Sequence, residues 1–138
     1  MRALRDPDLR AVIICPSNPF ISIDPILALP GVRAALADAA APVIAISPII
    51  AGRAVKGPTA KMMAELGLKV DPLTVAAHYG RLIDGYVMDE ADSGLAALLD
   101  LPVETTPTLM QSLDDREALA RAVLDFADRI AVRVSPIE

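Results

Sequence analysis

The apolar segment Ala11-Val-Ile-Ile-Cys15, which ends at Pro16, decides the fold, because segments of the same kind return along the chain. Val43-Ile-Ala-Ile-Ser47 and Tyr86-Val-Met-Asp89 are equally short, and Val103 to Thr106 is a weaker fourth example. Short apolar runs bounded by turn residues are typical of strands that are buried on both faces of a sheet. The sequence therefore predicts four strands.

Helix signals fill most of the segments between these strands, although Pro48 to Gly57 is predicted to be a long loop. Pro58 suits the first position of a helix that ends at Gly67, and Asp71-Pro72 again combines a capping side chain with a proline. Strands that alternate with helices predict a parallel sheet in an α/β fold. Four parallel strands indicate half of a doubly wound sheet, or a subunit that a partner completes. The helices are predicted at 22–29, 31–40, 58–67, 71–83 and 91–99. A last helix is predicted to start near Asp114, and its apolar side chains lie on one face at helical spacing: Leu119, Val123, Phe126 and Ile130.

Composition excludes several classes of protein. With 138 residues, of which 54% are apolar, the chain is predicted to form one folded domain over residues 1–138. Eighteen acidic and thirteen basic residues give a net charge of −5, which is opposite to the basic footprint of nucleic-acid-binding proteins. The single cysteine, Cys15, excludes an internal disulfide framework and a multi-cysteine zinc site, and we expect it to be an inert thiol in the core.

The sequence predicts neither a membrane span nor a signal peptide. The longest uncharged run, Ala39 to Gly52, has fourteen residues and contains two prolines, whereas a span needs about 20 apolar residues. The stretch from Met1 to Asp8 has no apolar core of the kind that signal peptides contain. We therefore expect a cytoplasmic protein that binds neither membranes nor nucleic acids.

The polar residues that follow the predicted strands are the candidate site, because ligands of open α/β sheets bind beyond the carboxyl ends of the strands. Ser17, Asn18 and Ser22 follow the first strand. Their small polar side chains, together with free backbone N–H groups at a helix start, form a cradle for an anion. Serine and asparagine are also the usual N-cap residues, so a capped turn explains the same sequence without a ligand.

A second group of candidates surrounds the start of the helix predicted at 58–67. Lys56 and Lys61 bracket that start, where the helix dipole disfavours cations unless an anion binds between them. Gly57 leaves the backbone free to approach a ligand closely. The alternative is a pair of ordinary solvated lysines near a loop, and the Gly-Lys-Ser/Thr sequence of a P-loop is absent.

Asp89 is the one candidate for a metal ligand, because a carboxylate at the end of a strand can hold Mg²⁺ for phosphate chemistry. A helix cap at Asp89, with Asp92 in the first turn, explains the same residues without a metal. His78 is the only histidine and lies within a predicted helix. We expect His78 to be a packed or surface side chain and not a general base.

Several segments carry a more specific signal through their order and spacing. They are Ser17-Asn-Pro-Phe-Ile-Ser-Ile-Asp-Pro-Ile-Leu27, Pro30-Gly31, Ser47-Pro-Ile-Ile-Ala-Gly52, Lys56-Gly-Pro-Thr-Ala-Lys-Met-Met63, Asp84-Gly85, Asp89-Glu-Ala-Asp92 and Thr108-Leu-Met110. Together, over about residues 8–130, they resemble the C-terminal half of the 2-phospho-L-lactate transferase (CofD-like) family. The resemblance implies a Rossmann-like α/β sheet and a dimer.

The resemblance also implies a reaction in the biosynthesis of coenzyme F(420). A phospholactyl or phosphoenolpyruvyl group moves from a guanosine diphospho donor to the terminal hydroxyl of the deazaflavin Fo, GMP leaves, and Mg²⁺ assists. The turn at Ser17-Asn18 and the lysines Lys56 and Lys61 would suit the diphosphate of the donor.

Members of that family are much longer and carry a Gly-rich turn in an N-terminal half that has no counterpart here. Because the metal and Fo contacts are expected mainly in that half, we expect this chain to be inactive alone. It would then act with a complementary N-terminal half or as a homo-oligomer. One alternative is a regulatory module that binds nucleotides or nucleotide sugars without transferring anything, and another is a structural remnant held together by self-association.

Overall fold

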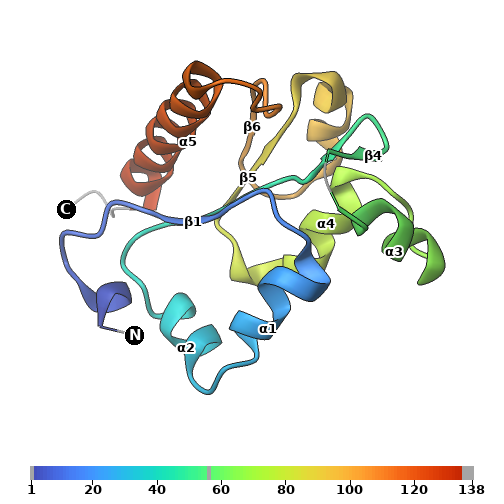
Figure 1. The fold of residues 1–138 in the computed structure, drawn as a ribbon. Helices are drawn as coiled ribbons and strands as arrows, with labels where there is room; N and C mark the ends of the chain where they lie inside the picture. The colour runs from blue at the N-terminus through green and yellow to red at the C-terminus, as the bar shows by residue number, and fades with distance from the viewer. Residues whose placement is uncertain (1, 56, 135–138) are drawn as a thin grey trace.

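The computed structural model describes residues 2–55 and 57–134, and its centre is a four-stranded parallel sheet. The strands are β1 (Val12–Ile14), β2 (Val43–Ile46), β5 (Gly85–Met88) and β6 (Val103–Thr105), and they lie in this order across the sheet (Figure 1). Parallel pairing runs through all three neighbours, with Ile13 opposite Ile44, Ala45 opposite Tyr86, and Val87 opposite Glu104. The four predicted strands and the α/β fold class are therefore confirmed.

The helices follow the predicted order, with changes at their ends. The helix predicted at 71–83 ends at Tyr79, because Gly80 has a φ of +54° and the chain continues as a short 3₁₀ turn. The helix predicted at 91–99 is a 3₁₀ helix. The helical elements are η1 (Ala3–Arg5), the π-helical turn η2 (Pro19–Ile23), α1 (Asp24–Leu27), α2 (Val32–Ala37), α3 (Thr59–Glu65), α4 (Pro72–Tyr79), η3 (Gly80–Leu82), η4 (Glu90–Leu98) and α5 (Leu113–Val134).

The loop predicted from Pro48 to Gly57 contains a small hairpin that the sequence did not predict. Its antiparallel strands are β3 (Ile49–Ile50) and β4 (Arg53–Ala54). The two residues of the turn, Ala51 and Gly52, have φ of 47° and 74°. Two-residue hairpin turns require positive φ, and an alanine at the first position gives no such signal in the sequence.

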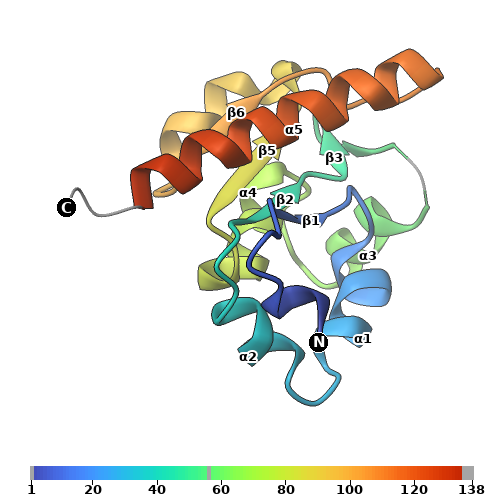
Figure 2. The ribbon, with the colours of Figure 1, turned by 90° about the vertical axis from the view of Figure 1, so that its left-hand side faces the viewer.

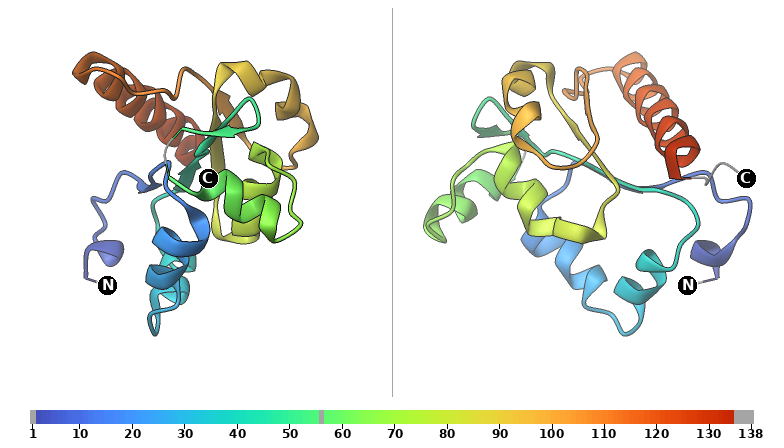
Figure 3. Two further views of the ribbon diagram at one scale, coloured as in Figure 1. Left: turned by 45° about the vertical axis from the view of Figure 1, so that its right-hand side comes forward. Right: turned by 180° about the vertical axis from the view of Figure 1, so that it is seen from behind.

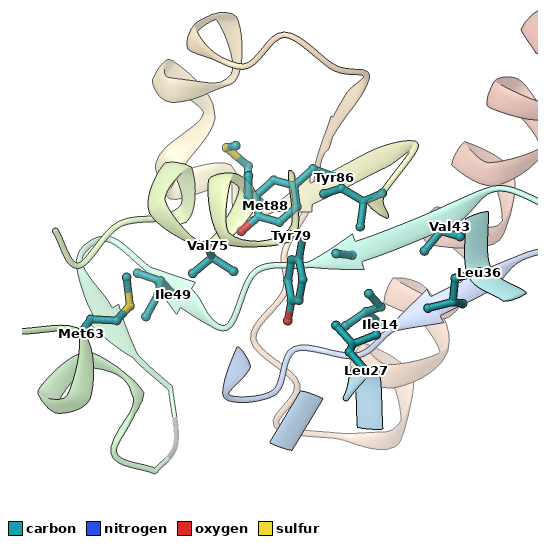
Figure 4. Close-up of a cluster of buried hydrophobic side chains, with 13 residues drawn as sticks. Ile14, Leu27, Leu36, Val43, Ile49, Met63, Val75, Tyr79, Tyr86 and Met88 are labelled. Atoms are coloured by element: carbon teal, nitrogen blue, oxygen red, sulfur yellow. The ribbon is translucent and has the colours of Figure 1, made fainter. Parts of the chain in front are cut away.

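The sheet is covered on both faces, but by very different numbers of elements. One face packs against α1, α2, α3 and α4, and Figure 4 shows the resulting cluster of buried side chains, with Tyr86 and Met88 of β5 beside Val75 and Tyr79 of α4. The other face packs against α5 alone, which crosses the sheet opposite the remaining helices (Figures 2 and 3). As predicted, Leu119, Val123, Phe126 and Ile130 form the buried face of that helix.

Cys15 is exposed, so the prediction of a core thiol was wrong. β1 is an edge strand, and its side chains alternate between the two faces of the sheet. Val12 and Ile14 turn toward the cluster under α1 and α2, whereas α5 packs on Ile44, Ile46 and Val87 of the central strands. Cys15 lies just past the end of β1, and neither cluster of buried side chains includes it.

We predict that Gly85→Ala destabilises the fold, because α5 lies directly on this residue. A Cβ atom at Gly85 would lie 2.5 Å from Cδ1 of Ile130 and 2.8 Å from Cε1 of Phe126. Overpacking of this kind costs about 1–3 kcal/mol of unfolding free energy. Urea denaturation followed by circular dichroism measures the loss.

Gly94→Ala is the matched control, since a Cβ atom there meets nothing within 4 Å. Its unfolding free energy should change by no more than about 0.5 kcal/mol. If the two variants had equal unfolding free energies, the packing of α5 on the sheet would not require a glycine at position 85.

Candidate functional site

Three connections that follow strands of the sheet enclose a cavity of about 340 Å³. They are the segments after β1, after β2 through to α3, and after β6. Parallel strands end at the same edge of a sheet, and ligands of α/β proteins bind at that edge. The lining residues are Pro16, Ser17, Asn18, Ile21, Ser22, Ser47, Pro48, Val55, Gly57, Pro58, Thr59, Thr108 and Met110.

Asn18 shapes the first wall of the cavity by capping the helical turn that follows it. Its Oδ1 accepts hydrogen bonds from the backbone N–H groups of Phe20 (2.9 Å) and Ile21 (3.2 Å). Its Nδ2 lies 3.4 Å from the sulfur of Met62 in α3, which joins the first wall to the second. The capped turn is therefore confirmed, and the same residue also lines the cavity together with Ser17 and Ser22.

Ser47 supports the second wall from a fully buried position directly after β2. Its Oγ donates to the carbonyl oxygen of Ile49 (3.0 Å) and accepts from the N–H of the same residue (3.1 Å), so the chain turns sharply into the hairpin. Next to it, the buried hydroxyl of Tyr86 has no hydrogen-bond partner among the described residues. Burial raises the pKa of Tyr86, so this phenol stays neutral.

The start of α3 completes the second wall. Thr59 is fully buried and lines the cavity, and Gly57 lies beside it with a φ of +72°. Lys56 lies outside the described residues. Lys61 points away from the cavity, because its Nζ lies 3.7 Å from Glu65 on the exposed side of α3. The phosphate-binding roles of Lys56 and Lys61 stay predictions.

Asp89 holds the third wall in place, although it does not itself line the cavity. One carboxylate oxygen accepts from the N–H of Ala91 (3.0 Å) and caps η4, as predicted. The other accepts from both the N–H (2.8 Å) and the hydroxyl (3.1 Å) of Thr108. Asp89 and Thr108 are both buried, so this clamp draws the segment after β6 across the end of β5 to the cavity.

A second carboxylate fixes the hairpin beside the site. The buried Asp92 accepts a hydrogen bond from the N–H of Ala51 (2.9 Å), the residue with positive φ at the tip of the turn. An αL alanine is strained, and a carboxylate on its N–H compensates part of that strain. Asp89 and Asp92 therefore serve the walls of the cavity, each with an oxygen already engaged by backbone N–H groups.

The described lining offers hydrogen-bond donors without charged side chains. Ser17, Ser22 and Thr59 contribute hydroxyl groups, and Ile21, Val55 and Met110 contribute apolar surface. No group of three or more acidic, histidine or cysteine side chains within residues 2–55 and 57–134 is arranged to hold a metal ion. Such a lining suits hydrogen bonds to oxygen atoms beside an apolar ring or chain.

His78 belongs to a different part of the molecule. Its Nε2 lies 3.0 Å from both carboxylate oxygens of Asp24 in α1, and its ring packs against Phe20. These contacts connect α4 to the start of α1 and leave His78 outside the cavity lining. The prediction of a packed or surface histidine is confirmed.

Four residues outside the predicted site also line the cavity: Ser47, Thr59, Thr108 and Met110. Ser47 directly follows a predicted strand, and that position is a sequence signal for a site residue. Thr108 lies two residues beyond the end of the segment predicted as the fourth strand, and only the clamp from Asp89 brings it to the cavity. None of the helices in the described part of the chain is long and apolar enough to span a membrane.

Comparison with known proteins gives one consistent result. The family model described as 2-phospho-L-lactate transferase CofD matches residues 1–125. A 2-phospho-L-lactate transferase of Methanocaldococcus jannaschii is 37% identical over 126 residues, which are 91% of this chain and 39% of that protein. A phosphoenolpyruvate transferase of Streptomyces griseus is 36% identical, and the match covers 86% of this chain and 39% of that protein. A 2-phospho-L-lactate transferase of Methanosarcina barkeri is 38% identical, and the match covers 94% of this chain and 42% of that protein. The chain thus spans about two fifths of the length of these relatives.

We predict that Asp89→Ala releases the third wall of the cavity. The substitution leaves the buried N–H and hydroxyl of Thr108 without their acceptor, which costs about 1–3 kcal/mol of unfolding free energy. Hydrogen exchange followed by mass spectrometry should show faster exchange in the peptide that contains Thr108, and urea denaturation should show the loss of stability.

Glu90→Ala is the control, because the neighbouring Glu90 is exposed and does not line the cavity. It should change the unfolding free energy by at most about 0.5 kcal/mol and leave exchange at Thr108 unaltered. Unchanged exchange at Thr108 in Asp89→Ala would contradict the clamp.

Proposed function

Because the chain belongs to the 2-phospho-L-lactate transferase CofD family, we propose that it forms the donor-binding part of a phospholactyl or phosphoenolpyruvyl transferase. In this proposal the donor is a guanosine diphospho compound, the acceptor is the terminal hydroxyl of the deazaflavin Fo, and the reaction belongs to the biosynthesis of coenzyme F(420). Relatives named for each of the two transferred groups match the chain at 37% and 36% identity, so the proposal covers both groups.

The observation that carries the proposal is the convergence of three strand-following connections on one cavity. Ser17 and Ser22 of the first connection and Thr59 of the second border it with hydroxyl groups, and Thr108 of the third borders it while its own N–H and hydroxyl donate to Asp89. The hydroxyl groups of the two serines and Thr59 are donors that phosphate oxygens accept. The apolar surface of Val55 and Met110 provides room for the uncharged part of a ligand.

The size of the cavity suits part of the donor. About 340 Å³ lies at the lower end of the range of small-molecule sites, which is about 300–1,000 Å³. A diphosphate and its neighbouring groups fill such a space, while a deazaflavin acceptor needs further surface. The proposal therefore places the diphosphate in the cavity and leaves Fo to surfaces that this chain does not provide.

In this proposal the role of the chain is to position the phosphate groups of the donor for the transfer. In the transfer, an oxygen lone pair of the acceptor hydroxyl forms a bond to the phosphorus that carries the lactyl or enolpyruvyl group. The bond from that phosphorus to the GMP oxygen breaks, and GMP leaves. The proton of the acceptor hydroxyl is lost to solvent or to a base. Phosphoryl transfers of this kind depend mainly on alignment and charge neutralisation. Hydroxyl donors in the lining hold the phosphate oxygens, and no described lining residue is a general base.

The described residues do not fit a Mg²⁺ site. Asp89, the predicted candidate, uses one oxygen to cap η4 and the other to hold Thr108. The proposal therefore assigns no metal ligand to this chain and no step to the metal. We propose that the isolated chain has only part of the catalytic apparatus and does not catalyse the transfer.

We predict that the isolated chain binds GDP but releases no GMP. Calorimetric titration should detect GDP binding, and incubation with the guanosine diphospho donor, Fo and Mg²⁺ should give no GMP above background. GMP release by the isolated chain would contradict the expected inactivity. Binding of UDP-sugars in preference to GDP would instead support a nucleotide-sugar-binding module, and an absence of all nucleotide binding would support a structural remnant.

We also predict that Ser22→Trp blocks the cavity. Ser22 is exposed at the rim, and no hydrogen bond of its side chain is lost, so the fold should tolerate the larger residue. The indole occupies the space proposed for the donor and should weaken GDP binding at least about tenfold, or about 1.4 kcal/mol. Ser93→Trp, at an exposed position of η4 outside the lining, should bind GDP like the unmodified chain.

A further inference from the structure

The hydroxyl of Tyr86 is a buried polar group without a hydrogen-bond partner in the described part of the chain. The residue is 0% exposed and belongs to the apolar cluster between the sheet and the helices α1 to α4. Buried hydroxyl groups are normally hydrogen-bonded, because burial removes them from the water that would otherwise be their partner. A phenylalanine would fill the same space without this cost, so the hydroxyl of Tyr86 needs an explanation.

The register of the sheet places Tyr86 near Ser47, which lines the cavity. Tyr86 of β5 lies opposite Ala45 of β2, and Ser47 follows Ala45 by two residues. The N–H of Ser47 donates to the carbonyl oxygen of Val87 (2.8 Å), so the pairing of the two strands continues to Ser47. Side chains two residues apart in a strand point to the same face, and Ser47 therefore shares the face of Tyr86. Strand spacing and rise put the two Cα atoms roughly 8 Å apart, a distance that a tyrosine side chain can bridge.

The ring of Tyr86 also points in the required direction. Figure 4 shows the ring extending from β5 toward the end of β2 where Ile49 lies, and away from Val43 at the start of β2. Ser47 stands between β2 and Ile49 in the chain. The phenol is therefore directed toward the edge of the sheet that carries the cavity.

Ser47 has a hydrogen-bonding position that suits this phenol. A serine hydroxyl has one proton and two lone pairs. The proton of Ser47 is donated to the carbonyl oxygen of Ile49, and one lone pair accepts from the N–H of the same residue. The second lone pair can still accept a hydrogen bond, and the hydroxyl of Tyr86 is a donor without an acceptor among the described residues.

We propose that Tyr86 is a positioning residue for the cavity: its hydroxyl donates to Ser47, and Ser47 donates its own proton to a phosphate oxygen of the bound ligand. For this the O–H of Ser47 turns from the carbonyl oxygen of Ile49 into the cavity. A hydroxyl whose oxygen accepts a hydrogen bond is polarised, and it becomes a stronger donor toward an anion. The inference rests on the proposed function, because it takes the ligand to be the diphosphate of the donor.

The bond from Tyr86 contributes to affinity, because it strengthens only when Ser47 holds an anion. An interaction that differs between the free and the bound protein shifts the binding equilibrium by the whole of that difference. A bond of equal strength in both would stabilise the fold and leave affinity unchanged. This distinction separates a positioning role from a structural one.

The burial of Tyr86 suits it to this role. Burial raises the pKa of the phenol, so the phenol keeps its proton at neutral pH and can donate. The ring lies in the same cluster as Val75 and Met88, where a lysine would have to give up the hydration of its charge. A neutral phenol therefore brings a hydrogen bond from the apolar core to the wall of the cavity at a lower cost.

Titration calorimetry of Tyr86→Phe with pyrophosphate and with GDP tests the proposal. Loss of one hydrogen bond from the bound state should weaken binding of both ligands about fivefold. The urea midpoint of the variant, measured without ligand, should be unchanged or higher, because the hydroxyl that is removed has no partner in the fold. In a Ser47→Ala background the same change should have no further effect on binding, since Tyr86 acts through Ser47.

Tyr79→Phe is the matched control, because it removes a phenol hydroxyl from the same cluster. Tyr79 is 4% exposed and does not line the cavity. Figure 4 shows its ring extending away from that of Tyr86, toward the side of Ile14. This variant should bind pyrophosphate and GDP like the unmodified chain.

Tyrosine labelled with ¹³C at Cζ gives a second readout, which does not require a substitution at Ser47. The chain contains two tyrosines, so two signals are expected, and the two phenylalanine variants assign them. Addition of pyrophosphate should shift the signal of Tyr86, because the hydrogen bonding of its hydroxyl changes, and should leave that of Tyr79 in place.

The outcomes separate this inference from the proposed function. If GDP binds and Tyr86→Phe binds it equally well, the role of Tyr86 is overturned and the proposed function stands. A lower urea midpoint of Tyr86→Phe also overturns the role, because the hydroxyl would then be bonded without the ligand, for example to a buried water. If pyrophosphate binds but GDP does not, the guanosine donor is wrong and the pyrophosphate titration decides the role of Tyr86. Binding of neither ligand overturns both.

Discussion

The burial of the two central strands on both faces is the constraint on which the rest of the structure depends. Every residue of β2 and β5 is buried, so each face of this pair needs an apolar cover. The connecting helices provide it on one side and α5 on the other. Gly85 lets α5 approach closely enough for Phe126 and Ile130 to reach the sheet. A parallel sheet whose centre were exposed would lose the main driving force of its folding.

The same constraint creates the candidate site. Parallel strands with helices between them must end at one edge, and the connections that leave that edge meet above it. Buried carboxylates then hold those connections: Asp89 draws Thr108 to the cavity, and Asp92 fixes the hairpin tip at Ala51. A buried carboxylate is tolerated beside the cavity because backbone N–H groups donate hydrogen bonds to its oxygen atoms. The acidic residues thus build the walls, while hydroxyl groups face the cavity.

The two edges of the sheet differ in their surroundings. The chain matches about two fifths of the relatives' length, and β1 and β6 are the edge strands of the sheet that it forms. The charged and proline-flanked surroundings of β6 are suited to solvent, whereas Ile13 of β1 and Cys15 just past its end are not. The described lining of the cavity combines hydroxyl groups with apolar surface.

The sequence by itself determined the four strands, their parallel α/β arrangement, the buried face of α5 and the family, and it offered the capping roles of Asn18 and Asp89 beside ligand-binding roles. These features follow from local patterns of apolar and capping residues, because they depend on interactions between residues that are close together in the sequence. Only the tertiary structure decided that Cys15 is exposed, that Ala51 adopts a positive φ in a hairpin, and that Lys61 points away while Thr108 reaches the cavity. Each of these depends on what packs or bonds across the fold, and contacts between residues far apart in the chain leave no local pattern.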